Sequence, residues 1–461
     1  MQCQKYNVSG LNLETAVISG QNNLTSLEKI PCDEGWIFDK TTFPSSVVYD
    51  FQLVCGNEYL PNVAQSGYFV GSLIGTFATG LTSDLFGRRK AILLNLALVS
   101  IVGIAISFSP NFIIYMVLRF FTAISVQGIS SVCYTLGNEL VIPSKRIVVM
   151  AILLVSSGCG YVTLSGMAKL ISTWKMLHLT VAMFVIILLI IACFLVPESP
   201  RWLLACDRSS DAEVVLRKMA NGNGKQLTED FTTKVSNTTA NLQKANEAKE
   251  NMKDVIRSRT GIFMGITLSF IWMVMSLTFF GHTLNTSSFG IDPYLSLCFF
   301  GAIETPAFFS GMFLTGHLGR KNIVFASFIL GGICCCLVPV IALPLWKLLF
   351  AVAGKFFVAV TYGTVILWTI EMVPTSMRNR LIGLLAISAR VGGIIAPMLL
   401  ILEDIWHGLP VLVFGLLSFA AGFLCLLLPE TTDISLPVTM KDTKELYRTE
   451  KDVVKRSEER Y

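Results

Sequence analysis

The chain alternates long apolar runs with short polar links, and eleven of the runs are roughly twenty residues long. In helical form, a run of that length spans the hydrocarbon core of a bilayer, which is about 30 Å thick. The pattern therefore predicts an all-α membrane protein. The predicted spans cover 62–82, 91–109, 112–136, 147–168, 175–196, 261–281, 293–316, 322–343, 345–370, 381–402 and 408–429.

Polar landmarks between the runs recur at a fixed offset of 232 residues (319 minus 87). The recurring landmarks are GRR at 87–89 with GRK at 319–321, Glu139 and Arg146 with Glu371 and Arg378, and Pro197-Glu198 with Pro429-Glu430. A multi-helix unit that occurs twice in parallel orientation is typical of secondary transporters. The repeat therefore predicts two bundles of helices.

The predicted domains are an external region at 1–61, a first bundle of five spans at 62–196, a cytoplasmic loop domain at 197–260, a second bundle of six spans at 261–429, and a tail at 430–461. The span 261–281 has no counterpart in the first bundle, because the matching residues 29–49 are polar. We therefore expect one helix upstream of Met1 to be missing, as in a fragment, a short isoform or a mispredicted gene start.

Composition supports the membrane assignment, because 53% of the residues are hydrophobic, 15% are charged and the mean hydropathy is +0.63. The net charge of +5 comes from basic loops on one side, so it indicates orientation and no nucleic-acid partner. By the positive-inside rule, the C-terminus is cytoplasmic, the N-terminus is extracellular, and the chain is a multi-pass protein of the cell membrane. The sequons at Asn7, Asn23 and Asn285 then lie outside, where glycans are attached.

Three cysteines, Cys3, Cys32 and Cys55, fall in the external region, where disulfides persist. A bond between Cys32 and Cys55 is one of the pairings that this set allows. The other cysteines are typical of packing residues in helices. No Cys or His spacing resembles a metal site, and no nucleophile or phosphate loop appears. We therefore expect no metal, no cofactor and no enzymatic activity.

Four stretches resemble known transporters. G-x-x-x-D-x-x-G-R-R at 80–89 is similar to the cytoplasmic signature of the major facilitator superfamily, and PESPRWL at 197–203 is similar to that of its sugar and organic-ion branches. CDEGWIFDKTTFPSSVVYDFQLVC at 32–55 and EMVPTSMRN at 371–379 resemble solute carrier family 22, the organic cation, carnitine and organic anion transporters. The resemblance covers 32–430. It implies the two-bundle fold of twelve helices, of which this chain holds eleven and lacks the first.

Charged residues at the predicted cytoplasmic helix ends are candidates for contacts that close this face while the cavity is open outward. Asp84 and Arg88, four residues apart, can pair with each other or with the other bundle. In both halves, a Glu followed seven residues later by an Arg can form a similar pair. Anchoring at the membrane interface is the alternative role. The candidate gating residues are Asp84, Arg88, Arg89, Glu139, Arg146, Arg320, Glu371 and Arg378.

Ionisable residues in mid-span are costly and therefore indicate function. Arg390 and Glu304 are the main candidates, and Arg119 and Lys355 are less specific ones. The resemblance implies that Arg390 selects charge, because anion and carnitine transporters carry Arg at the matching position and cation transporters carry Asp. An Arg can hold a carboxylate with two hydrogen bonds. Glu304 matches an acid of the cation and carnitine branches, so both charges together suggest a zwitterion. A Glu304–Arg390 salt bridge is the structural alternative.

Aromatic residues are candidates for the cavity wall, because their faces bind ammonium groups. Trp272, Phe279 and Phe280 lie on one face of the predicted helix 261–281, which lines the substrate path according to the family resemblance. Tyr362 lies on another predicted helix. Phe308 stands where anion carriers have Lys, which disfavours an anion as substrate.

The sequence predicts a secondary transporter of small organic ions that works by alternating access. The expected substrates are zwitterions such as carnitine-like compounds, or organic anions, with Na⁺ or H⁺ as candidate co-transported ions and the lipid bilayer as surroundings. One alternative is a non-transporting truncated isoform that binds or regulates a full-length partner. Another is an organic cation or sugar porter of the same superfamily. The sequence does not indicate an oligomeric state.

Overall fold

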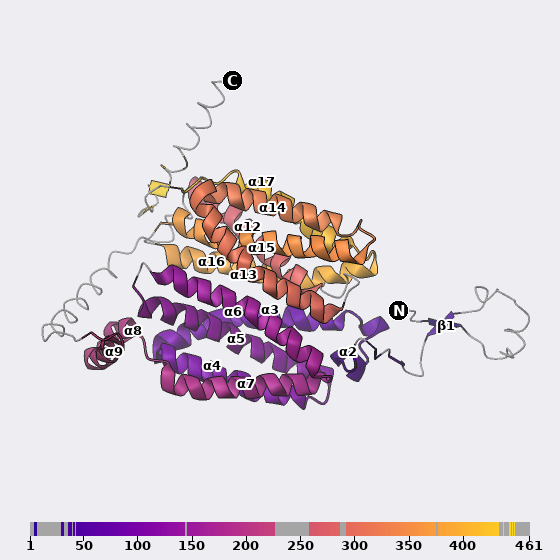
Figure 1. Ribbon diagram of the computed structural model, residues 1–461, viewed down its shortest axis with the longest axis horizontal. Coiled ribbons are helices and arrows are strands. Elements are labelled where there is room, and N and C mark those ends of the chain that lie inside the picture. The colour runs from indigo at the N-terminus through magenta and orange to yellow at the C-terminus, as the bar shows by residue number, and fades with distance from the viewer. Residues whose placement is uncertain are drawn as a thin grey trace, which may run out of the picture.

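The computed structural model describes residues 4–6, 29–31, 36–38, 40–41, 43–142, 145–225, 258–285, 292–374, 377–432, 437, 442–443, 445 and 447. These residues form two helical bundles that lie side by side, with the first bundle in indigo to magenta and the second in orange to yellow (Figure 1). The glycosylation candidates Asn7 and Asn23, and also Cys32, lie outside the described residues.

The first bundle consists of α3 (Leu60–Phe86), α4 (Arg88–Ser107), α5 (Phe112–Leu140), α6 (Arg146–Leu170) and α7 (Trp174–Leu195). The second consists of α12 (Arg259–Leu284), α13 (Pro293–Leu318), α14 (Arg320–Leu337), α15 (Pro344–Met372), α16 (Arg378–Leu400) and α17 (Leu409–Cys425). Within the described chain, ten of these helices are long and apolar enough to cross a membrane, and α17, at 17 residues, is one shorter apolar helix. The predicted helical membrane fold is therefore confirmed. A two-stranded antiparallel pair, β1 (Gln4–Tyr6) and β2 (Lys29–Pro31), precedes it.

The sequence repeat corresponds to a repeated helix start. Gly87 and Gly319, at the N-caps of α4 and α14, have φ values of +99° and +85°, which favour glycine. Glu198 accepts a hydrogen bond from the first backbone N–H of α4 at 2.7 Å, and Glu430 does the same for α14 at 3.0 Å. A carboxylate at a helix N-terminus satisfies free N–H groups and the helix dipole. The repeated Pro-Glu landmarks are therefore capping residues.

The two bundles differ in how well their helices are covered. In the second bundle, α12 packs against α15, α16 and α17, and α17 buries eight residues. In the first bundle, the longer α7 buries three residues, and α6 packs mainly along α13 of the other bundle. Among the described residues, no helix of the first half occupies the position that α12 holds in the second.

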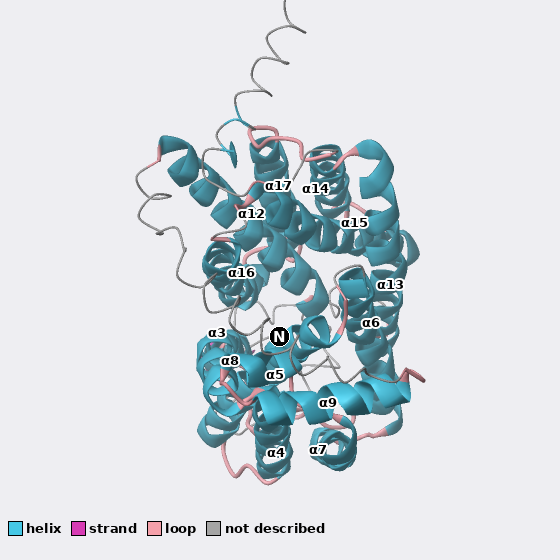
Figure 2. Ribbon diagram, turned by 90° about the vertical axis from the view of Figure 1, so that its left-hand side faces the viewer, coloured by secondary structure: helices cyan, strands magenta, loops and turns pink. Residues whose placement is uncertain are grey.

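The ends of the bundles are distinguished by short helices outside the spans. At one end lie α8 (Pro200–Ala205) and α9 (Ser209–Gly222), which face the viewer in Figure 2. At the other end lies α2 (Val47–Asp50), followed by the 3₁₀ turn η2 (Cys55–Asn57); a second 3₁₀ turn, η5 (Ile401–Asp404), follows α16. We refer to these ends as the α9 end and the α2 end.

The bundles meet along two lines, α3 against α16 and α6 against α13. The Ser66 hydroxyl of α3 donates to the Ile394 carbonyl of α16 at 2.9 Å. The Lys169 ammonium of α6 lies 2.5 Å from the Asp292 carboxylate at the start of α13. Both contacts lie near the α2 end, so the bundles are joined at that end.

The helix α2 is attached to the first bundle. Asp50 accepts a hydrogen bond from the Trp174 indole at 3.0 Å and lies 3.2 Å from the Lys175 ammonium. The preceding segment reaches the second bundle, because the Phe43 ring lies 5.6 Å from the Tyr294 ring.

Candidate substrate site

A buried ion pair occupies the middle of the second bundle. The Lys355 ammonium of α15 lies 2.9 Å from the Glu304 carboxylate of α13, and both side chains are fully buried. Lys355 also donates to the Thr283 hydroxyl at 2.7 Å and to the Phe279 carbonyl at 3.3 Å. The alternative that pairs Glu304 with Arg390 is therefore wrong. The reason is that α15 lies between α13 and α12 and delivers a closer cation than α16 does.

Two arginines from different bundles lie near Tyr68 of α3. Both Arg119 and Arg390 lie within electrostatic range of the Tyr68 hydroxyl, and the Arg119 guanidinium is 5.4 Å from the Tyr68 ring. Arg119 donates to the Gln65 amide oxygen at 2.9 Å and to the Tyr115 hydroxyl at 3.0 Å. Within the described part of the chain, neither arginine has a carboxylate partner. Two positive charges are thus left uncompensated between the bundles.

A tyrosine of α6 connects the two charged groups. Tyr161 lies within electrostatic range of Glu304, Tyr68 and Tyr362. The resulting set, which we call the central cluster, draws on both bundles and consists of Tyr68, Arg119, Tyr161, Phe279, Glu304, Lys355, Tyr362 and Arg390. Tyr68 and Tyr161 were not among the site residues predicted from the sequence. A tyrosine in mid-span is a weak signal, although its hydroxyl needs a partner inside a membrane.

The predicted aromatic wall is only partly present. Phe279 lies against Tyr362 with ring centroids 4.9 Å apart, and its ring lies 3.4 Å from the Lys355 ammonium. Phe280 contacts Phe69 of the first bundle at 4.7 Å.

Trp272 lies elsewhere, in the hydrophobic core of the second bundle. It is 5% exposed, and its indole N–H donates to the Thr369 hydroxyl at 3.0 Å. This packing favours a structural role for Trp272 over the predicted contact with substrate, because seven residues, about two helical turns, separate it from Phe279 along α12.

The candidate gating charges pair inside their own bundles. Arg88 binds Glu139 through two nitrogens, each at 3.1 Å, and also contacts Asp84 at 3.1 Å. In the second bundle, Arg320 lies 3.0 Å from Glu371. Each arginine begins a helix and faces the last turn of the helix that carries the glutamate, which explains the shared geometry.

The predicted Glu139–Arg146 and Glu371–Arg378 pairs are wrong, because the helix-start arginines occupy both glutamates. Arg146 is exposed at the start of α6, and Arg378 donates to the Val373 carbonyl at 3.4 Å. The remaining gating candidate, Arg89, donates to the Cys193 carbonyl at 2.6 Å.

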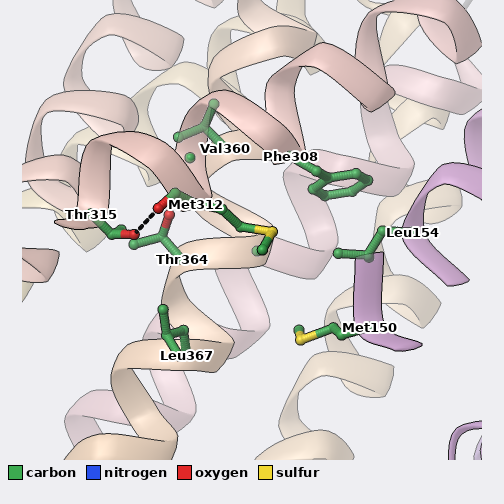
Figure 3. A pocket seen from close by; sticks show the side chains of 10 residues that line it. Met150, Leu154, Phe308, Met312, Thr315, Val360, Thr364 and Leu367 are labelled. Atoms are coloured by element: carbon green, nitrogen blue, oxygen red, sulfur yellow. Dashed lines mark hydrogen bonds between the residues drawn. The ribbon is translucent and has the colours of Figure 1, made fainter. Parts of the chain in front are cut away.

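A small cavity lies between the bundles in their α9 halves. Met150 and Leu154 of α6 form one wall, and Phe308, Met312 and neighbouring residues of α13 and α15 form the other (Figure 3). The lining is almost entirely apolar. Because the bundles meet near the α2 end and leave this space toward the α9 end, the structure is open toward the α9 end.

The described residues include one cysteine of the predicted disulfide, Cys55, and one predicted glycosylation site, Asn285. Cys55 is disulfide-bonded, but its pairing with Cys32 stays a prediction, since Cys32 is outside the described residues. Asn285 is 3% exposed, which disfavours a glycan at that side chain in this conformation. At the start of α13, the hydrogen bond from Lys169 holds the pKa of the Asp292 carboxyl below its ordinary value of 3.8.

Comparison with known proteins agrees with this architecture. The family model described as "Sugar (and other) transporter" matches residues 47–439. Human "Solute carrier family 22 member 13" is 33% identical over 417 residues, which cover 90% of this chain and 74% of the relative. "Solute carrier family 22 member 6-B" of Xenopus laevis is 32% identical, with coverages of 94% and 80%. "Organic cation transporter 1" of Caenorhabditis elegans is 30% identical, with coverages of 96% and 77%.

Solved structures show the same fold at low sequence identity. The inward open conformation of the xylose transporter XylE from E. coli is 17% identical and aligns with a TM-score of 0.68 over 89% of this chain and 92% of that chain. A partially occluded inward open conformation of XylE aligns with a TM-score of 0.62 over 86% and 93%. The family model, the relatives and the two-bundle fold all agree. The chain therefore belongs to solute carrier family 22 of the major facilitator superfamily, a family of membrane transporters.

Proposed function

We propose that this transporter carries small organic anions across the cell membrane by alternating access, with Arg390 as the main contact for the substrate carboxylate. The observation that carries the proposal is the charge of Arg390 and Arg119 near Tyr68, for which the described residues supply no carboxylate partner. In a cavity of low dielectric, an arginine without a protein carboxylate attracts an anion strongly. Tyr68 and Phe279 supply faces for a flat organic group.

The position of Glu304 argues against a cation or a zwitterion as the preferred substrate. An acid that attracts an ammonium group must present its charge to the cavity. Glu304 is fully buried and already paired with Lys355. The sum of the central charges is therefore positive, which favours anions over the carnitine-like zwitterions that the sequence also allowed.

We also propose that the α9 end faces the cytoplasm and the α2 end faces outward, in the cell membrane. The support comes from the basic loops, since the Arg88 and Arg320 helix starts lie at the α9 end. With this orientation the structure is an inward-facing state, closed outside by the contacts between α6 and α13.

The test is uptake of labelled benzoate, carnitine and tetraethylammonium by cells that express the chain. We expect benzoate uptake, and we expect Arg390→Gln to lower its kcat/KM by about 10- to 100-fold, the effect of losing a hydrogen bond between charged groups. Arg390→Lys keeps the charge but not the two-pronged hydrogen bonding. Its kcat/KM for benzoate should therefore lie between those of the wild-type chain and Arg390→Gln.

Surface expression of each variant serves as the control. Uptake of tetraethylammonium that Arg390→Gln leaves unchanged would contradict the anion proposal. Normal surface expression with no uptake of any compound would instead favour the non-transporting, regulatory alternative.

A further inference from the structure

The Glu304–Lys355 pair is unevenly satisfied. Lys355 has three other partners, namely the Thr283 hydroxyl, the Phe279 carbonyl and the Phe279 ring. Glu304 has only Lys355, because within the described chain no hydrogen bond reaches its second oxygen, Oε2, which is buried. An unsatisfied buried carboxylate oxygen is costly, and a bound proton removes its charge. Lys355, by contrast, keeps its hydrogen bonds when the ion pair is broken.

Glu304 also lies where the two bundles cross. The helices α6 and α13 approach so closely that a Cβ added at Gly158 would lie 2.7 Å from the Gly301 carbonyl and 3.6 Å from the Glu304 Cβ. Gly301 lies one turn before Glu304. When the bundles part at the α2 end, this crossing opens. Access to Glu304 therefore differs between the two states of the transporter.

The opposite side of Glu304 leads toward the cavity of Figure 3. Phe308, which lines that cavity, is four residues after Glu304 and so one turn along the same face of α13 (Figure 3). In the present state, the cavity between the bundles thus reaches to within one helical turn of the carboxylate. The direction along α13 from Glu304 to this cavity points toward the α9 end.

The groups around Glu304 offer it no second cation. Tyr161 of α6, Tyr68 of α3 and Tyr362 of α15 lie in the same electrostatic environment. His282 of α12 faces Lys355, but its ring nitrogens contact the Thr278 carbonyl at 3.1 Å and a cysteine sulfur at 3.5 Å. Among the described residues, Lys355 is therefore the one cation in contact with Glu304.

We infer that Glu304 is a proton-binding site and that the transporter carries one proton together with each organic anion. A proton from the α2 side forms an O–H bond at Oε2 in the outward-facing state, and the ion pair with Lys355 breaks. After the bundles rock, the O–H bond breaks, the proton passes to water in the cavity at the α9 end, and the ion pair forms again. The state described above contains the ion pair and is the released form. This inference rests on the proposed function.

The test is uptake of labelled benzenesulfonate, an organic anion that stays charged and does not cross the bilayer as a neutral acid, into vesicles that contain the purified chain, with the inside held near neutral pH. An inward gradient of about two pH units should drive accumulation of up to about 100-fold. A protonophore should abolish this accumulation, and replacement of Na⁺ by choline should leave it unchanged. Glu304→Gln, which resembles the protonated form, should lose the response to the gradient and keep exchange of labelled for unlabelled benzenesulfonate at equal pH.

Glu58→Gln is the matched control, because Glu58 is an exposed carboxylate at the α2 end; it should keep the full gradient response. A full response in Glu304→Gln would overturn the inference, as would a dependence on Na⁺ in place of protons. The wild-type chain gives a second measurement with a pH dye, since added benzenesulfonate should acidify the vesicle interior. Benzenesulfonate exchange without acidification overturns the proton site alone, whereas no exchange in the wild-type chain overturns the proposed function as well.

Discussion

Four ionisable residues at membrane depth differ in their surroundings, and these surroundings separate their roles. Lys355 and Glu304 neutralise each other in full burial. Arg119 is held by the neutral groups of Gln65 and Tyr115, so it keeps its charge for the cavity. Arg390 has no such partners among the described residues and is only partly buried. Lys355 and the two arginines carry the same formal charge but differ in role, because only Lys355 has a carboxylate partner among the described residues.

A substitution of Trp272 can show whether this residue packs in the hydrophobic core or contacts the substrate. Trp272→Phe removes the hydrogen bond to Thr369 and some buried area, so we expect a loss of about 1–2 kcal/mol in stability and a lower Tm. Thr369 keeps its own bond to the Val365 carbonyl at 2.7 Å. The KM for substrate should not change. Trp346→Phe is the control, because Trp346 is 54% exposed. A changed KM with an unchanged Tm would return Trp272 to the cavity wall.

At this scale the sequence identified which residues are unusual but not how they pair. A charge within an apolar run is visible in the sequence, so Arg390, Glu304 and Lys355 could be found. Their partners lie on other helices, 51 residues away for Glu304 and Lys355 (355 minus 304), and the local pattern does not contain the rotation of one helix against another. The same limit explains why Arg88, and not Arg146, was found to pair with Glu139.

At the scale of elements, the starts of α4 and α14 depend on glycine. A Cβ at Gly87 would lie 2.4 Å from the Glu198 carboxylate that caps α4, and the φ of +99° is unfavourable for alanine. Gly87→Ala should therefore destabilise the first bundle by at least about 1 kcal/mol, measured as a lower Tm in detergent. Gly80→Ala, a helical position with open space around it, should be neutral or stabilising. Equal effects of the two substitutions would contradict this account.

The positions of the helices were easier to predict from the sequence than the contacts between them. The apolar runs gave the positions of the spans, and the 232-residue offset indicated that the residues at the starts of α4 and α14 repeat. The tyrosine contacts of α6 and the capping role of Glu198 and Glu430 were not predictable, because both depend on how distant segments pack.

At the scale of the whole molecule, Lys169 and Asp292 hold the bundles together at the α2 end. The lowered pKa of Asp292 means that its stabilising charge is complete above the ordinary Asp pKa and is lost only as the pH falls through the lowered value, below 3.8. This contact therefore does not titrate between about pH 5.5 and 7.5. A proton effect on transport in that range therefore does not report on this pair.

Asp292→Asn should favour parting of the bundles at the α2 end. Because the pair is partly exposed, we expect a shift of no more than about five-fold, which corresponds to about 1 kcal/mol. The measurement is the rate at which an impermeant thiol reagent, applied outside, labels Ser66→Cys in a chain without other accessible cysteines. Ser66 is buried under the joined ends. Asp211→Asn on α9 is the control. A labelling rate that falls or stays the same in Asp292→Asn would contradict a closing role for this pair.

The attachment of α2 has a pharmacological consequence. Asp50 holds this segment to Trp174 and Lys175 of the first bundle, so a binder confined to α2 moves with that bundle and leaves the cycle unhindered. A binder that spans Phe43 and the start of α13 near Tyr294 would instead clamp both halves together. Such an antibody would inhibit transport from the α2 side without competing with substrate, and raising the substrate concentration would not restore the rate.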